Sequence, residues 1–436
     1  MIIVDTSLQK RLAAGDPVRV GMVGAGYMGR GIALQILTAM PGLRLVAIAN
    51  RDASQAERAY REAGATELRS VASPAELEAA IAAGAYAVTD DPTVLCRAGG
   101  VEAVIETTGD VESGARVSLE AVRNGKHVVL MNAETDAAVG PILKVYADRN
   151  GVVYSYTDGD EPGVAMNLYR FVDSIGYRPV CLGQIKGFLD RYRNPDTQRG
   201  FAEKHKQKPA MVASFADGSK LALESAIIGN ATGFRPGVLG MYGHQCAHVK
   251  DLLNHFTPDH FKDGGLVDFV LGAEPHTGAF VIGFNDHPVK RQYMSYFKFG
   301  DGPLYMFYTP YRLPHLQLPL SVARAVLHHD ATLAPLGAPV CEAVAYAKRE
   351  LKAGEILDGM GGFTCYGLID SYDAGGTERY LPMSLSVDCR LKRDIPKDQP
   401  LRYDDVVLPV GRTCDQLRAE QTAHFAGPAA RVKAPA

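Results

Sequence analysis

Long apolar runs, paired cysteines and a strong excess of either charge are all missing from this sequence of 436 residues. No apolar stretch reaches the roughly 20 residues that span a bilayer. The opening residues also lack the basic, apolar and small-residue regions of a signal peptide. The seven cysteines are odd in number and contain no CxxC pair, which argues against a disulfide framework and a zinc site. We therefore expect a reduced, cytoplasmic protein.

The balance of charges indicates which binding partners the protein is suited to. A formal net charge of −3 favours neither nucleic acid nor an anionic membrane surface. Apolar residues make up 47% and charged residues 22%, a globular composition, and the length predicts two or three domains. We expect a small-molecule substrate, no nucleic acid and no membrane.

The chain also lacks the Ser-x-Cys-Thr-Thr-Asn motif of phosphorylating aldehyde dehydrogenases of the glyceraldehyde-phosphate type, which argues against that class of enzyme.

One glycine turn stands in an informative context, at residues 18–29. A β-branched run leads directly into Gly-x-Gly-x-x-Gly, and an apolar helical pattern begins at Ile32. Strand, glycine turn and helix together are typical of dinucleotide binding, because the helix N-terminus faces the pyrophosphate. A glycine turn without a ligand is the alternative. The residues that we expect to contact the cofactor here are Gly24, Gly26, Tyr27, Met28 and Gly29.

The end of the second predicted strand, residues 43–49, bears on which dinucleotide is bound. An acidic residue at this place usually holds the ribose 2′-hydroxyl of NAD, whereas an arginine can pair with the 2′-phosphate of NADP. The chain has Asn50 and Arg51 there, which favours NADP (NADPH). Asp52 follows and leaves NAD open.

Strand and helix patterns alternate as far as about residue 157, which predicts an α/β fold with a doubly wound parallel Rossmann sheet. Further strands are expected at 85–88, 101–106, 126–131 and 152–156, and residues 53–82 read as helix, loop, helix. Ligands of such sheets bind at the carboxyl ends of the strands. Four more residues are therefore predicted near the cofactor: Thr107, Thr108, Gly109 and Asn132.

The order of elements changes after residue 157. An α+β catalytic and oligomerisation domain is expected over 158–335, with 317–333 packing back on the first domain, 1–157. Helices are expected at 163–175, 221–230 and 318–329. The strands expected in this region are 180–185, 211–215, 279–284 and 304–308, with a hairpin turn at Asp217-Gly218.

A small β-rich module is expected over 336–415, followed by a frayed tail, 416–436. Residues 348–357 and 392–401 share Lys-Arg-acid-aliphatic and a leucine nine residues after the lysine. This pair predicts internal symmetry in the module.

Three carboxylates, Asp158, Asp160 and Glu161, follow the last Rossmann strand. Together they repel one another unless they are solvated, protonated or bridged by a cation. A divalent ion such as Mg²⁺ or Mn²⁺ would chelate both oxygens of a hydroxyketone. Binding of a substrate hydroxyl without metal, or capping of the next helix, are the alternatives.

Lysines in the middle region are candidate proton donors. Lys186 is the first, oriented by Asp190, although the spacing of four also fits a helix-surface ion pair. Lys220 is the second. Residues 204–208 form a basic segment for which phosphate binding and a solvated face are both open. His244 and His248 have a metal-compatible spacing, but no third ligand accompanies them, which favours structural or surface histidines.

The N-terminal part resembles the cofactor domain of homoserine dehydrogenases. The resemblance rests on the glycine turn, on Glu106-Thr-Thr-Gly109 and on Gly125-Lys-His-Val-Val-Leu-Met-Asn132. Ala133 stands where that family has a lysine that serves the chemistry. We therefore expect the chemistry on residues from Asp158 onward.

Residues 336–409 resemble an SAF (antifreeze-like) domain, through the stretches 347–357, Tyr380-Leu-Pro-Met383 and Lys392-Arg-Asp-Ile395. A homoserine-dehydrogenase-like front with an SAF tail resembles the deoxyxylulose-phosphate-reductoisomerase-like (DRL) family. The resemblance implies an NADPH-dependent reductoisomerase of isoprenoid biosynthesis, converting 1-deoxy-D-xylulose 5-phosphate to 2-C-methyl-D-erythritol 4-phosphate.

The sequence thus predicts an NADP-dependent oxidoreductase acting on a small polyhydroxylated carbonyl compound or sugar phosphate. Two alternatives stay open. One is a simple dehydrogenase of a sugar acid, a hydroxy acid or homoserine. The other is a non-catalytic sensor that binds nucleotide and carbohydrate. A homodimer or homotetramer is expected, because middle domains of this type usually pair through their sheets.

Overall fold

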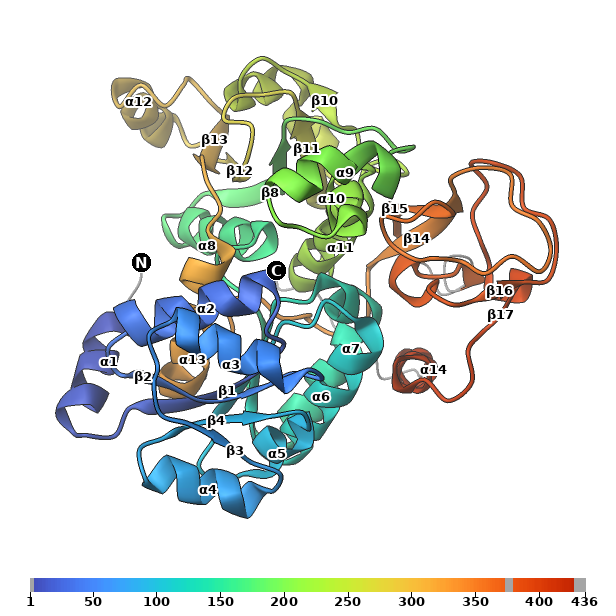
Figure 1. Ribbon diagram of the computed structural model, residues 1–436. Helices are drawn as coiled ribbons and strands as arrows, with labels where there is room; N and C mark the ends of the chain where they lie inside the picture. The colour runs from blue at the N-terminus through green and yellow to red at the C-terminus, as the bar shows by residue number, and fades with distance from the viewer. Residues whose placement is uncertain (1–3, 373–378, 427–436) are drawn as a thin grey trace. The chain divides into compact units, whose positions relative to one another are not determined.

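Figure 1 shows the computed structural model, which describes residues 4–372 and 379–426. The chain divides into two compact units. The first comprises the described residues up to Asp160, together with Leu313–Ala334 and Gln416–Gln421. The second comprises Glu161–Arg312, Pro335–Asp415 and the described residues from Thr422 onward. In the described ranges, no helix combines the length and the apolar character needed to cross a bilayer.

The first unit contains a seven-stranded parallel sheet with strand order β3-β4-β2-β1-β5-β6-β7. The order reverses at β1, because β2 and β5 lie on its two sides. A ligand of such a sheet binds beyond the carboxyl ends of the strands at this switch point. The strands are β1 Val18–Val23, β2 Leu43–Ala49, β3 Leu68–Ser70, β4 Tyr86–Thr89, β5 Ala103–Glu106, β6 His127–Leu130 and β7 Tyr154–Tyr156.

The helices of this unit cover an apolar sheet. Residues of α1, α2, α3 and α13, among them Leu8, Ile32, Ala59 and Val322, share one core with the strands. The doubly wound prediction is confirmed by the parallel pairing and the strand order. The helices are α1 Val4–Ala13, α2 Tyr27–Ala39, α3 Ala53–Glu62, α4 Pro74–Ala82, α5 Pro92–Arg97, α6 Val111–Arg123, α7 Ala133–Arg149 and α13 Pro314–His328.

Strand β3 is the element of this sheet that the sequence pattern missed. It lies inside residues 53–82, which were expected to be helix, loop and helix. The strand is only three residues long, and Arg69 and Ser70 are exposed. An edge strand of this length shows neither an apolar run nor a clear alternation, so its pairing with β4 leaves no signal in the sequence.

The prediction of a frayed tail is wrong as far as Phe425, because helix α14 spans Thr413–Phe425. Pro141 interrupts the hydrogen bonding of α7, and α14 supplies partners at that place. Arg418 donates to the carbonyl of Ala138 at 3.0 Å, and the Gln421 side chain accepts from the amide of Ile142 at 3.1 Å. Residues 427–436 lie outside the described residues.

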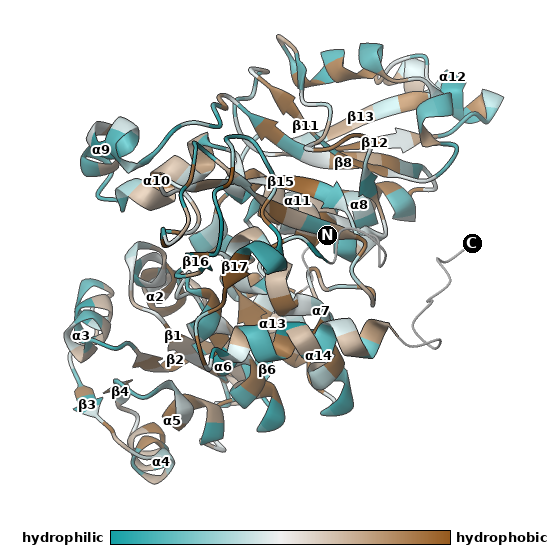
Figure 2. Cartoon of the chain, turned by 90° about the vertical axis from the view of Figure 1, so that its right-hand side faces the viewer, coloured by the Kyte–Doolittle hydropathy of each residue, from teal (hydrophilic) through white to brown (hydrophobic). Residues whose placement is uncertain are grey.

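The second unit contains a six-stranded sheet with the order β10-β11-β8-β12-β13, and β9 pairs with β11. Strand β11 is parallel to β8, whereas β12 is antiparallel to β8 and β13. Figure 2 shows the hydrophobic colour gathering on these strands, while helix α9 (Pro195–Lys204) is mainly hydrophilic. The strands are β8 Arg178–Lys186, β9 Arg235–Pro236, β10 His244–Gln245, β11 Leu266–Leu271, β12 Ala279–Phe284 and β13 Leu304–Thr309.

The two faces of this sheet are covered differently. Helices α8 and α11 pack along one face. On the other face, Val249, Leu252 and Phe261 of the short 3₁₀ helices share a core with the strands. The helices of this part are α8 Glu161–Ser174, α10 Pro209–Ala216, α11 Ser219–Thr232 and α12 Pro288–Tyr296, and the 3₁₀ helices are η1 Val249–His255 and η2 Pro258–Phe261.

The strand expected at 211–215 is wrong, because these residues lie in helix α10. Asp217-Gly218, expected as a hairpin turn, instead joins α10 to α11, with Gly218 in the left-handed region. A five-residue apolar run fits a buried strand and a buried helix equally well, so periodicity alone did not distinguish them. Pro209 at the first turn of α10 was the available signal for a helix.

The C-terminal part of the second unit is β-rich. Strands β14 (Cys341–Ala347) and β15 (Cys365–Ser371) form one antiparallel pair, and β16 (Arg390–Leu391) and β17 (Val406–Val407) form another. Its described residues also form the 3₁₀ helices η4 Met383–Leu385 and η5 Tyr403–Asp405. We call the described residues from Pro335 to Asp415 the C-terminal module.

The internal symmetry predicted for this module is confirmed. Leu351 and Ile395, which are equivalent in the two repeats, exchange backbone hydrogen bonds at 2.9 and 3.0 Å. The flanking bonds are reciprocal as well. Gly354 donates to Leu391 as Asp398 donates to Ala347, and Leu357 donates to Cys389 as Leu401 donates to Ala345. One repeat therefore lies antiparallel to the other about a local twofold axis.

Candidate active site

The glycine turn connects β1 to α2 at the switch point of the first sheet. Gly24 has φ +103°, and a side chain there would come 2.9 Å from the backbone oxygen of Thr107. A side chain at Gly29 would collide with the backbone oxygen of Gly24. At Gly26, by contrast, nothing lies within 4 Å of the place that a Cβ would take. This open position at the start of α2 suits the close approach of a pyrophosphate.

The end of β2 supports the same turn. The side chain of Asn50 accepts from the amide of Ala25 at 3.1 Å and donates to the carbonyl of Asp52 at 2.9 Å. Asp52 caps α3 through Ser54, and these hydrogen bonds lower its pKa. Arg51 is exposed and makes no ion pair within the described part of the chain. Its guanidinium is therefore available to a ligand.

The ends of β5 and β6 bring Thr108 and Asn132 together. Asn132 caps α7 by accepting from the amide of Thr135, and it donates to Thr108 Oγ1 at 3.4 Å and to the carbonyl of Asp110 at 3.1 Å. Asn132 is fully buried, and its hydrogen bonds hold the loop 107–110. A direct contact with the cofactor, as predicted, stays untested.

Glu106 is a residue of this edge that was not predicted as part of the site. It ends β5 and is fully buried, and burial raises the pKa of its carboxyl to about 7. Hydrogen bonds with Thr108 oppose this shift, with the amide of Thr108 at 2.9 Å. The available signal was an acidic residue at the end of an otherwise apolar strand.

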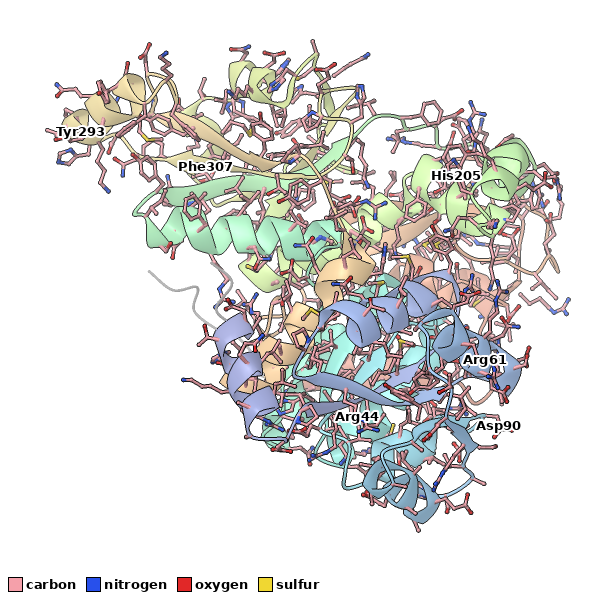
Figure 3. The ribbon with its side chains drawn as sticks, turned by 60° about the vertical axis from the view of Figure 1, so that its left-hand side comes forward. Arg44, Arg61, Asp90, His205, Tyr293 and Phe307 are labelled. Atoms are coloured by element: carbon pink, nitrogen blue, oxygen red, sulfur yellow. The ribbon has the colours of Figure 1, made fainter. Side chains whose placement is uncertain are left out.

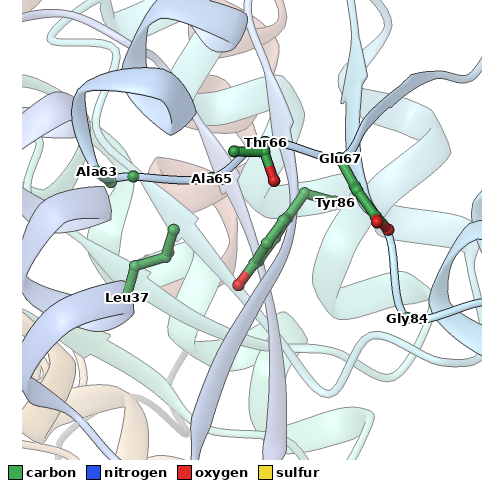
Figure 4. A pocket seen from close by; sticks show the side chains of 8 residues that line it. Leu37, Ala63, Ala65, Thr66, Glu67, Gly84 and Tyr86 are labelled. Atoms are coloured by element: carbon green, nitrogen blue, oxygen red, sulfur yellow. The ribbon is translucent and has the colours of Figure 1, made fainter.

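A cavity of about 260 Å³ lies elsewhere in the same unit (Figure 4). Tyr86, the first residue of β4, and Gly84 line it together with the segment 63–67 that follows α3. This cavity is therefore at the amino end of β4. Ligands of parallel sheets bind at the opposite ends of the strands, so the cavity is not a candidate for the dinucleotide site.

The second unit holds a cluster of charged side chains around Lys186. Lys186 is the last residue of β8, and its ammonium lies 3.0 Å from a carboxylate oxygen of Glu161, the first residue of α8. The same ammonium is 3.9 Å from a carboxylate oxygen of Glu224 on α11. The side chain of Lys186 is 13% exposed, whereas those of Glu161 and Glu224 are 3% and 1% exposed.

Arg312 also belongs to this cluster, and Lys220 lies on the helix that carries Glu224. The guanidinium of Arg312 lies 2.9 Å from the Glu161 oxygen that also faces Lys186, and it packs over the ring of Phe215. Lys220, a predicted site residue, is buried in the first turn of α11, one turn before Glu224. Arg312 was missed because nothing in its sequence surroundings marks it, and the fold alone brings it to Glu161.

The pairing predicted between Lys186 and Asp190 is wrong. Lys186 ends a strand, so a spacing of four residues does not place the two side chains on one helix face. Asp190 instead pairs with Arg193 at 3.1 Å, and its backbone amide donates to the carbonyl of Ala216. Glu161 and Glu224 take the place that Asp190 was expected to have.

The three carboxylates predicted as metal ligands make different contacts. Asp158 accepts from the amide of Gly159, and Asp160 accepts from the hydroxyl of Tyr156 at 2.6 Å. In the second unit, one oxygen of Glu161 and one of Glu224 lie within 4.8 Å of each other, which would suit a divalent ion. The ammonium of Lys186 faces both of these carboxylates, so a second cation there would meet charge repulsion.

The sequence pointed to two further polar groups. The basic segment 204–208 begins at the last residue of α9, and Lys204, His205, Lys206 and Lys208 are exposed, as Figure 3 shows for His205. His244 and His248 do not share a helix, because His244 is in β10 and His248 caps η1. Neither group shows a preformed ligand site.

Two parts of the chain match known protein families. Residues 159–318 match the family described as "Oxidoreductase DRL, catalytic domain". Residues 18–131 match the GFO/IDH/MocA family, described as "Oxidoreductase family, NAD-binding Rossmann fold". The DRL resemblance is thus confirmed for the catalytic region. The resemblances to homoserine dehydrogenase and to SAF domains stay predictions.

A comparison with curated proteins found no match. Similar solved structures include an NAD binding oxidoreductase from Klebsiella pneumoniae, at 20% identity over 41% of this chain and 45% of that chain, with a TM-score of 0.27. This chain spans less than half of that one. A probable dehydrogenase from Thermotoga maritima has 12% identity over 73% of this chain and 91% of that chain, with a TM-score of 0.40. Scyllo-inositol dehydrogenase from Lactobacillus casei, with bound NAD(H) and scyllo-inositol, has 15% identity over 62% and 74%, with a TM-score of 0.36.

The family matches agree with the geometry. The Rossmann match covers the glycine turn and the ends of β2, β5 and β6, and the DRL match covers Glu161, Lys186, Lys220, Glu224 and Arg312. The chain is therefore an NAD(P)-binding oxidoreductase, with a Rossmann segment of the GFO/IDH/MocA type at residues 18–131 and a DRL-type catalytic segment at residues 159–318.

Proposed function

We propose that this protein reduces a small polyhydroxylated carbonyl compound with NADPH, and that Lys186 is the proton donor. One observation carries the proposal. An ammonium group ends a strand in the segment that matches an oxidoreductase catalytic domain, and two nearly buried carboxylates face it. Reduction of a carbonyl needs such a group, because the oxygen gains negative charge as the hydride arrives.

Glu161 and Arg312 have supporting roles in this mechanism. The carboxylate of Glu161 holds the Lys186 ammonium at 3.0 Å, and the guanidinium of Arg312 contacts the same oxygen at 2.9 Å. The nicotinamide, when bound, supplies the hydride. Lys186 then gives a proton to the developing alkoxide, and Lys220 adds a second positive charge from the first turn of α11.

The preference for NADPH is also a proposal. Arg51 follows β2 at the place where a 2′-phosphate is recognised in Rossmann domains, and it is exposed without an ion-pair partner in the described chain. The carboxylate of Asp52 is occupied by Ser54, which leaves it less suited to the 2′-hydroxyl of NAD. Both observations favour the phosphorylated dinucleotide.

The most specific form of the proposal is conversion of 1-deoxy-D-xylulose 5-phosphate to 2-C-methyl-D-erythritol 4-phosphate. The match of residues 159–318 to the DRL catalytic domain supports it. A simple dehydrogenase of a sugar acid or hydroxy acid is the second candidate. A rearrangement would use a divalent ion that chelates the substrate, and this ion would need the carboxylates of Glu161 and Glu224. The ammonium of Lys186 already faces both carboxylates, which favours a simple dehydrogenase.

A substrate panel separates these forms. Deoxyxylulose phosphate, homoserine and sugar acids are each tested with NADPH, NADP, NADH and NAD, with and without EDTA. NMR then identifies the carbon skeleton of the product. A rearranged skeleton identifies the reductoisomerase. An unrearranged product whose formation survives EDTA identifies the dehydrogenase. Turnover of homoserine alone, or activity confined to the NAD pair, would contradict the proposal.

A further inference from the structure

Lys348 is a buried cation far in sequence from the residues of the proposed reaction. It follows β14 in the C-terminal module, and its side chain is 4% exposed. Its ammonium donates to a carboxylate oxygen of Asp217 at 2.8 Å, to the carbonyl of Arg193 at 2.7 Å and to the carbonyl of Gly362 at 2.7 Å. An ammonium group has three hydrogens, so these three acceptors use all of them.

The contact with Asp217 bears on the start of helix α11. Gly218, which precedes the helix, has no side chain to cap it, and the other carboxylate oxygen of Asp217 accepts from the amide of Ser219 at 2.8 Å instead. The hydroxyl of Ser219 in turn accepts from the amide of Gly367 in β15 at 2.9 Å. Two residues of the module therefore hold the first turn of α11, which carries Lys220.

The contact with Arg193 bears on the segment that follows Lys186. This segment runs from the end of β8 to α9, and Asp190 is anchored to the carbonyl of Ala216 at 2.8 Å. The hydroxyl of Tyr192 donates to the carboxylate of Asp398 in the module at 2.9 Å. The same lysine thus contacts the segment that follows Lys186 and, through Asp217, the start of the helix that carries Lys220.

The internal repeat of the module gives a comparison for this lysine. Lys392 is the equivalent residue of the second repeat, and its backbone amide donates to Asp405 at 2.8 Å as that of Lys348 donates to Thr364 at 2.7 Å. Yet the side chain of Lys392 is exposed. The repeat motif alone therefore does not bury a lysine at this position, and two of the three acceptors of Lys348, Asp217 and Arg193, lie in the catalytic region.

We infer that Lys348 is a positioning residue, through which the C-terminal module holds the elements that carry Lys186, Lys220 and Glu224. The inference rests on the proposed roles of those residues. Displacement of a catalytic group by about 1 Å can reduce a rate by about two orders of magnitude. Loss of this tether should therefore lower kcat more than it affects cofactor binding, which belongs to the other unit.

The experiment compares full-length Lys348→Met with Lys392→Met at a temperature well below both melting temperatures. Lys348→Met should lower kcat at least tenfold, while KM for NADPH stays within twofold of the original. Lys392→Met should leave both within twofold. An unchanged kcat in folded Lys348→Met, or an equal loss in Lys392→Met, would overturn the inference.

A double variant separates positioning from stability. Lys348→Met combined with Asp217→Asn leaves no buried charge unpaired and keeps an acceptor for Ser219, so Tm should return toward the original. We expect kcat to stay at least tenfold low, because the hydrogen bond to the carbonyl of Arg193 is still missing. Recovery of kcat together with Tm would show a purely structural role and overturn the inference.

A readout without substrate keeps the inference testable if the proposed reaction is wrong. Hydrogen exchange of the peptides that cover 188–194 and 218–224 should be faster in Lys348→Met and in the double variant than in Lys392→Met. Unchanged exchange in both peptides would overturn the inference. Failure of the original protein to turn over any substrate in the panel would overturn the proposed function alone.

Discussion

The ammonium of Lys186 lies 3.0 Å from a carboxylate oxygen of Glu161, which joins the last residue of β8 to the first residue of α8. Both residues lie at ends of regular elements, whose backbones are held by the sheet and by the helix. Arg312 reaches the same oxygen at 2.9 Å. This arrangement fixes one ammonium in a nearly buried, hydrogen-bonded place, which is what a proton donor requires.

Replacing Lys186 by alanine tests the proton donor. We expect Lys186→Ala to lower kcat by about two orders of magnitude or more, because no proton is then delivered to the alkoxide. Lys262→Ala is the matched control, since Lys262 is an exposed lysine of the same unit and should leave kcat unchanged. Steady-state kinetics on the best substrate of the panel measure both. An unchanged kcat in folded Lys186→Ala would remove this residue from the reaction.

Substitution of two glycines of one turn should weaken NADPH binding in both cases but lower the stability in only one. A side chain at Gly29 collides with the backbone of Gly24, so Gly29→Ala should lower the melting temperature and weaken NADPH binding together. Gly26→Ala meets open space at an ordinary φ of −70°, so the protein should keep its stability. NADPH binding should nevertheless weaken at least tenfold, because the methyl group lies where the pyrophosphate approaches. Calorimetry measures the melting temperature, and fluorescence titration measures NADPH binding. Tight NADPH binding by Gly26→Ala would show that the dinucleotide does not bind at this turn.

Arg51 should decide the choice of cofactor. Arg51→Ala removes a charged partner of the 2′-phosphate, so KM for NADPH should rise about tenfold or more while KM for NADH changes little. Arg61→Ala, at an exposed arginine of the same unit, is the control. The ratio of kcat/KM for the two cofactors measures the effect. Equal losses for NADPH and NADH would show that Arg51 does not read the phosphate.

The buried carboxyl of Glu106 should make stability depend on pH. Burial raises its pKa from 4.5 to about 7, so the folded state holds this proton more tightly than the unfolded state. The contribution of Glu106 to the free energy of unfolding should therefore fall as pH rises from about 4.5 to about 7, by up to about 3 kcal/mol. Glu106→Gln mimics the protonated form and lacks this loss. Urea unfolding should show that the free energy of unfolding of Glu106→Gln, relative to that of the original protein, is higher at pH 8 than at pH 5. An equal difference at both pH values would contradict the raised pKa.

The candidate site residues of the two units differ in how far they could be predicted. The glycine turn, Asn50, Arg51 and Thr107 follow strand ends in a regular alternation, and each was predicted from its own neighbours in the chain. The charged cluster of the second unit was predicted only in part. Lys186 and Glu161 were named from local patterns, but their mutual contact was not, and Asp190 was assigned a role that Glu161 and Glu224 have.

The helices α10 and α14 show where local pattern stops being informative. The apolar run 211–215 fits a strand or a helix, and its helical form depends on the elements on which it packs. The sequence after residue 415 ends in small and polar residues, yet α14 forms because α7 offers the broken hydrogen bonds at Pro141. Neither partner is visible from the segment itself.

By itself the sequence determined the Rossmann fold, the place of the dinucleotide turn and the twofold repeat of the C-terminal module. These features repeat at short range, through a period of two in strands, a glycine spacing set by the turn, and two copies of one motif. The tertiary structure alone decided that Arg312 and Glu224 join Lys186, and that Lys348 rather than its repeat equivalent Lys392 is buried against Asp217. Such contacts join residues that are distant in the chain, so only the packing of the elements brings them within hydrogen-bonding distance.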